Sequence, residues 1–126
     1  MKFHNISTIL IWSENYKALA DWYQTTFDLK ITEALTYPDD TGILFEFPSG
    51  GPWLWIGQHS QVKGKNTDPC RIMFNISVNS VSEAYEYLLQ KDVKFLATPF
   101  LSPSGESYFA TMYDIDGNLV QIIGKK

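Results

Sequence analysis

Few side chains in this sequence could carry out chemistry on a substrate. The 126 residues include two histidines, His4 and His59, and one cysteine, Cys70. The histidines do not form a closely spaced metal-binding pair, and no nucleophile has an evident base beside it. Arg71 follows Cys70, but in a strand it would point the other way, so we expect a half-buried, unreactive thiol. These residues predict no catalytic group and no metal site.

Charge and composition exclude several classes of function. The net charge is −4, and no basic run occurs beyond Lys125–Lys126, so we expect no binding to nucleic acid. The apolar segment Ile6–Trp12 is too short for a signal-peptide core or a membrane span, and we expect a cytoplasmic protein that does not bind membranes. The 4 Trp, 7 Tyr and 8 Phe exceed what a core of this size needs, so some rings should face a ligand or a partner chain.

The elements that would position these rings follow from apolar spacing. Ile6–Trp12 has the length and the β-branched content of a strand. After capping side chains at 13–15, helical spacing runs from Tyr16 to Phe27. The remaining strands predicted for this half are Lys30–Tyr37, Ile43–Phe47 and Trp53–Gly57.

The second half of the chain repeats this order. A strand is expected at Arg71–Val78, and Ser80 with Glu83 forms a Ser-x-x-Glu capping box before a second helix. Three more strands follow, at Val93–Ala97, Tyr108–Tyr113 and Leu119–Ile123. Both halves therefore read β-α-β-β-β.

The two halves can be superimposed along the sequence. A constant offset of 66 in the numbering places Leu10 on Ile76, Trp22 on Leu88 and Gly51 on Gly117, and no insertion is expected. We predict a single α+β domain over residues 1–126, with half-repeats at 3–58 and 70–124 and a polar linker at 59–69.

The segment Tyr113–Gln121 contains the turn Asp114-Ile115-Asp116-Gly117-Asn118, in which glycine accepts a positive φ and the Asp and Asn side chains bond neighbouring amides. We therefore predict a structural role for its acidic residues. This turn, together with the tandem βαβββ halves, resembles the vicinal oxygen chelate superfamily, which includes glyoxalases, bleomycin-resistance proteins and extradiol dioxygenases. The resemblance implies a mixed sheet curled around a cleft, with the helices outside.

The same resemblance implies four metal-ligand positions, on the first and last strands of each half. Carried over with the offset of 66, they are Ser7, Trp55, Met73 and Gln121. Divalent cations need carboxylate, carbonyl, imidazole or thiolate ligands, and this set supplies at most the amide oxygen of Gln121. We therefore expect neither a metal nor another cofactor.

Strand alternation predicts which side chains line the cleft instead. Ile9 and Ile11 are expected to share the cleft face with Ser7, whereas Ile6, Leu10, Leu54, Ile56, Ile72, Phe74 and Ile76 should pack beneath the helices. The candidate ligand-binding residues are Ser7, Phe45, Trp53, Trp55, Met73, Asn75, Tyr113 and Gln121. The alternative is that these rings fill a closed interior.

Two functions are compatible with these residues. The first is a metal-free protein of the glyoxalase/bleomycin-resistance type that binds an aromatic or amphipathic small molecule, as a homodimer. The second is a metal-dependent lyase, isomerase or dioxygenase with unusual ligands such as Glu46, Glu106 or His4. Metal-free acid–base catalysis would need a carboxylate with a raised pKa in the cleft, and the sequence offers no clear candidate.

Overall fold

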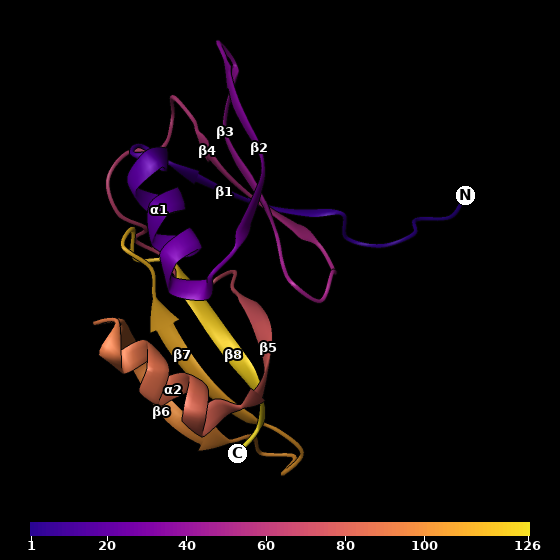
Figure 1. Cartoon of the computed structure of the whole chain (residues 1–126), viewed down its shortest axis with the longest axis vertical. Helices are drawn as coiled ribbons and strands as arrows, with labels where there is room; N and C mark the ends of the chain where they lie inside the picture. Colours follow the sequence, from indigo (N-terminus) through magenta and orange to yellow (C-terminus); the bar gives the residue numbers. More distant parts are fainter. The chain divides into compact units, whose positions relative to one another are not determined.

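The computed structural model describes residues 1–126 as two compact units, Met1–Gly64 and Lys65–Lys126 (Figure 1). The division falls within the segment predicted as a linker. The first unit contains β1 (Thr8–Ser13), α1 (Tyr16–Phe27), β2 (Lys30–Tyr37), β3 (Asp40–Glu46) and β4 (Trp53–Gln58). The second contains β5 (Phe74–Ser80), α2 (Val81–Gln90), β6 (Lys94–Leu101), β7 (Tyr108–Tyr113) and β8 (Leu119–Lys125). The predicted βαβββ order is confirmed in both halves.

Each unit has one four-stranded mixed sheet with the same topology. The strand orders are β1-β4-β3-β2 and β5-β8-β7-β6. The first strand of each unit pairs in parallel with the last, and the other neighbours are antiparallel. One helix covers one face of each sheet (Figure 1). Each sheet therefore has a helix-covered face and an opposite face, which we call the open face.

Side-chain caps start both helices where the sequence indicates. The Asn15 side-chain oxygen accepts a hydrogen bond from the amide of Ala18 at 3.4 Å, and the Ser80 hydroxyl accepts one from the amide of Glu83 at 3.2 Å. These caps satisfy amides that the helix itself leaves without partners. The apolar stripe of α1 buries Leu19 and Tyr23 against its sheet. Neither helix is long and apolar enough to cross a membrane.

The predicted turn after β7 has the expected structural role. Asp114 is buried, and its Oδ1 accepts hydrogen bonds from the amides of Asp116 and Asn118 at 2.8 and 3.0 Å. Gly117 adopts a φ of 79°. Asn66 is bonded to the same turn, through its amide to the Asp116 carbonyl at 2.8 Å and through Nδ2 to Asn118 Oδ1 at 2.9 Å.

The prediction that a constant offset of 66 relates the two halves of the chain, without insertions, is wrong. The residues that cap the two helices, Asn15 and Ser80, correspond at an offset of 65. Strands β2 and β6 begin at Lys30 and Lys94, an offset of 64, whereas β4 and β8 begin at Trp53 and Leu119, an offset of 66. The connections between elements therefore differ in length between the halves. Because successive strand residues face opposite sides, each difference of a single residue exchanges the predicted faces.

Candidate functional site

Strand β4 presents its tryptophans on the open face of the first unit. Leu54 and Ile56 are fully buried on the face that α1 covers. Trp53 and Trp55 alternate with them and therefore lie on the opposite face. The faces predicted for these four residues are confirmed.

The faces predicted for β1 are wrong. In the parallel pairing of β1 with β4, Leu10 lies beside Trp55 and Ile9 lies beside Leu54. Leu10 is therefore on the open face, where it is 56% exposed, and Ile9 is on the helix-covered face with Ile11. Ser7 precedes the strand and is exposed, with its Oγ 3.3 Å from Oγ1 of Thr8.

The residues assigned to the core at the strand entrances are also exposed. Ile6 and Ile72 precede β1 and β5 and are 70% and 82% exposed. Cys70, expected to be half-buried at the entrance of a strand, is exposed in a turn before β5. The Arg71 Nε atom lies 2.7 Å from Asp68 Oδ2, and the Arg71 amide donates to the Asp68 carbonyl. These local bonds hold residues 68–71 in a turn, and β5 begins at Phe74.

The face predicted for Phe45 is wrong as well. Phe45 pairs with Leu54 and is 0% exposed, which places it in the core beneath α1. Its neighbour Leu44 pairs with Trp55 and occupies the open face. The equivalent pair in the second unit joins Thr111 to Gln121, so β3 and β7 correspond at an offset of 67 rather than 66.

The indole of Trp55 lies against two glycines of its own sheet. A β-carbon added to Gly57 would lie 2.2 Å from Trp55 Nε1, and one added to Gly42 would lie 2.6 Å from Trp55 Cζ2. Only glycine leaves room for this ring so close to the backbone. Trp55 is accordingly only 6% exposed, although it belongs to the open face.

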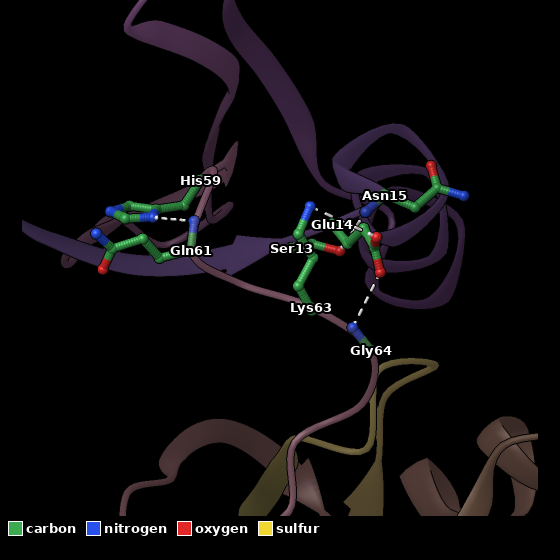
Figure 2. Close-up of polar contacts among 7 residues, drawn as sticks. All are labelled: Ser13, Glu14, Asn15, His59, Gln61, Lys63 and Gly64. Atoms are coloured by element: carbon green, nitrogen blue, oxygen red, sulfur yellow. Dashed lines mark hydrogen bonds and ion pairs between the residues drawn. The ribbon is translucent and has the colours of Figure 1, made fainter.

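Trp12 and His59 complete an aromatic cluster with Trp55. The ring centroids of Trp12 and Trp55 are 6.4 Å apart and those of Trp12 and His59 are 5.5 Å apart, both edge-to-face at 70°. Figure 2 shows the His59 ring, whose Nδ1 accepts a hydrogen bond from the Gln61 amide at 3.1 Å. Sequence reasoning missed Trp12 because it followed the wrong strand face, and it placed His59 in a linker. The glycines at 42 and 57, inside strands, were the signal that a large side chain approaches closely.

The linker residues after His59 are bonded to the start of α1. Glu14 Oε1 accepts a hydrogen bond from the amide of Gly64 at 3.0 Å, and its Oε2 lies 3.7 Å from Lys63 Nζ (Figure 2). The Ser13 hydroxyl accepts one from the Asn15 amide at 3.0 Å. The two contacts of Glu14 hold the segment that follows His59 against the start of α1.

The second unit has a more polar open face. The polar side chains of its strands lie on the face that the sequence predicts. Asn75, Gln121 and Thr111 are neighbours across β5, β8 and β7, and Gln121 Nε2 donates to Thr111 Oγ1 at 2.9 Å. Tyr113 lies two positions from Thr111 and is therefore on the same face. Phe74 and Ile76 share the other face with buried Val120 and Ile122, so these faces are confirmed. Met73 directly precedes β5 and is half-buried.

Comparison with known proteins identifies the family. The family model described as Glyoxalase/Bleomycin resistance protein/Dioxygenase superfamily matches residues 5–122. The chain belongs to this superfamily. No curated protein matches the chain.

Solved structures agree with this superfamily at the level of the fold. A superfamily member from Sphaerobacter thermophilus is 18% identical, with a TM-score of 0.78 and 98% of each chain covered. A superfamily domain from Frankia sp. is 14% identical, with a TM-score of 0.81, covering 99% of this chain and 100% of that one. Lactoylglutathione lyase from Agrobacterium tumefaciens is 16% identical, with a TM-score of 0.73, covering 98% of this chain and 96% of that one.

The structure revises one of the four positions where the superfamily resemblance implies metal ligands. Met73 lies seven positions before the helix cap Ser80, and the residue seven before the cap Asn15 is Thr8, not Ser7. Thr8 pairs with Trp53, which places it on the open face with Trp55. The revised set is Thr8, Trp55, Met73 and Gln121.

The revised set does not fit a divalent cation. It contains no carboxylate, imidazole or thiolate, and the Gln121 amide nitrogen is already bonded to Thr111. No group of three or more His, Cys, Asp or Glu residues is placed to hold a metal. Of the unusual ligands considered, His4 precedes β1, Glu46 ends β3 and Glu106 lies between β6 and β7.

Proposed function

We propose that this member of the superfamily is a small-molecule-binding protein that works without a metal. The observation that carries the proposal is the chemistry of Thr8, Trp55, Met73 and Gln121 at the four positions. Two of these side chains are apolar or aromatic, and none is a hard anionic ligand. An organic ligand suits them better than a cation does.

The open faces supply the remaining support. In the first unit, Trp53 is 46% exposed and Leu10 is 56% exposed beside the Trp55 cluster. In the second unit, Asn75, Tyr113 and Gln121 offer neutral hydrogen-bonding groups, and Met73 directly precedes β5. Binding sites for organic molecules combine apolar area with a few polar groups that fix orientation. The apolar side chains of the first face and the neutral polar groups of the second face each suit an aromatic or amphipathic ligand.

A metal analysis combined with a ligand screen tests the proposal. Purified protein is analysed for bound metals before and after dialysis against EDTA, and its thermal midpoint is measured against a panel of aromatic and amphipathic compounds. We expect substoichiometric metal, and ligand-dependent increases in midpoint that EDTA leaves unchanged. Stoichiometric metal that is lost together with ligand binding or activity would refute the proposal and would favour the metal-dependent lyase, isomerase or dioxygenase.

We further propose that the protein is a homodimer in the cytoplasm, without nucleic-acid or membrane partners. Leu10, Trp12 and Trp53 are exposed together on the first open face, and adjoining exposed apolar side chains are typical of an interaction surface. Exposed Cys70 is compatible with a reducing compartment. Sedimentation velocity at micromolar concentration should give a dimer, and a monomeric coefficient would refute this assembly.

A further inference from the structure

The Trp55 indole nitrogen is a buried donor without an acceptor. Nε1 is the one buried side-chain nitrogen or oxygen that has no hydrogen-bond partner, in a residue that is 6% exposed. Leaving such a group unpaired is unfavourable, because burial has removed its hydrogen bonds to water without replacing them. The cost is recovered when an acceptor reaches the N–H group.

The ring of Trp12 lies close to this donor, edge-to-face with the Trp55 ring. A β-carbon added to Gly57 would lie 2.2 Å from Trp55 Nε1 and 2.7 Å from Trp12 Cζ3, so both rings lie over the bare backbone of Gly57. An aromatic ring is at best a weak acceptor for an N–H group. Trp12 belongs to the edge strand β1 and is 37% exposed, so its side chain has room to turn away.

We propose that the Trp55 N–H donates a hydrogen bond to a neutral oxygen acceptor, such as a ketone, on a planar organic ligand that displaces the ring of Trp12. This inference rests on the proposed function and specifies the ligand class. The planar part of the ligand would contact Leu10 and Trp53, which are exposed on the same face. Stacking on indole rings and burial of apolar area would supply most of the affinity.

The charges of the open face favour a neutral acceptor over a carboxylate or phosphate. Strands β1, β3 and β4 place no Lys or Arg on this face, and the charged residues there are Asp40 and Glu46 of β3. Strand β2 adds Lys30 opposite Glu46, and Glu33 opposite Leu44. Carboxylates therefore outnumber cations on this face, and an anionic ligand would be repelled by them.

The test uses the fluorescent naphthalene ketone Prodan, which is planar, neutral and carries one carbonyl acceptor. The matched probe is the same dimethylaminonaphthalene without its acyl group. In a proton–nitrogen spectrum of the unmodified protein, Prodan should move the Trp55 indole resonance downfield by more than those of Trp12, Trp22 and Trp53. This measurement needs no variant of Trp55 in the titrated sample and so does not depend on how a variant folds.

Affinities then separate the hydrogen bond from stacking. Trp55→Phe keeps an aromatic ring but removes the donor, and it should weaken Prodan binding about fivefold, the equivalent of one neutral hydrogen bond. The same variant should change the affinity for the probe without a carbonyl by less than about twofold, because that probe has no carbonyl acceptor for the indole N–H. Trp53→Phe removes an exposed donor on the same face. It should change the affinities for Prodan and for the probe without a carbonyl by the same factor.

Three results would overturn the inference: an unmoved Trp55 resonance, equal losses for the two probes in Trp55→Phe, or no saturable Prodan binding. These results leave the proposed function standing if other compounds stabilise the metal-free protein. Stoichiometric metal, in contrast, would remove the proposed function without depending on Prodan.

Discussion

Leu10 lies beside Trp55 in the parallel pairing of β1 and β4, and the two side chains share the open face of the first sheet. This pairing decides the composition of the candidate site, because a shift by one residue would place Ile9 and Ile11 there instead. It also joins β1 to the aromatic cluster, since Trp12 follows on the same face and contacts both Trp55 and His59. The face is therefore apolar where the superfamily resemblance implies metal chemistry.

The assignment of faces predicts different effects for two leucines. Leu54→Ala should lower the free energy of unfolding by about 2–5 kcal/mol, because Leu54 is fully buried beneath α1. Leu10→Ala removes the same number of atoms from an exposed position and should cost less than about 1 kcal/mol. Urea unfolding of the two variants measures both values. A loss for Leu10→Ala that equals the loss for Leu54→Ala would contradict the assignment.

Because the Trp55 ring lies close to Gly42 and Gly57, a side chain added at Gly57 should clash with the indole. In Gly57→Ala the new methyl group would lie 2.2 Å from Trp55 Nε1, and overpacking of this kind costs about 1–3 kcal/mol. The same substitution in a Trp55→Ala background should cost less, because the ring that it meets is gone. A double-mutant cycle by urea unfolding measures this coupling, and additive losses would show that the ring does not lie over Gly57.

The sequence predicts elements best where local signals fix both ends. β2 and β7 have the predicted bounds, as does α1, which lies between capping side chains and the left-handed residue Asp28. β6 was predicted to end at Ala97 but continues to Leu101 through Pro99. It is an edge strand, where proline removes no sheet hydrogen bond, and its pairing is irregular between Ala97 and Phe100.

The candidate site was only partly predictable, for a physical reason. Alternation within one strand is a local property, so the faces of Trp55 and Gln121 relative to their own neighbours followed from the sequence. The face of Phe45 depends on the register between β3 and β4, which loop lengths and cross-strand contacts determine. Ser7 was predicted in place of Thr8 for the same reason, because the offset that fits the last strands fails by one residue at the first strands.

The cap of α2 gives the last prediction, which concerns the second unit alone. Ser80 Oγ accepts from the amide of Glu83 and donates to the main-chain oxygen of Lys126 at 2.5 Å, so one hydroxyl joins the helix start to the residue that follows β8. Ser80→Ala should cost about 0.5–2 kcal/mol, the usual loss for a helix cap. Ser82→Ala, in the first turn of the same helix, is the matched control and should change stability little. Both are measured by thermal and urea unfolding, and equal losses would mean that the Ser80 cap contributes nothing specific to the stability of this unit.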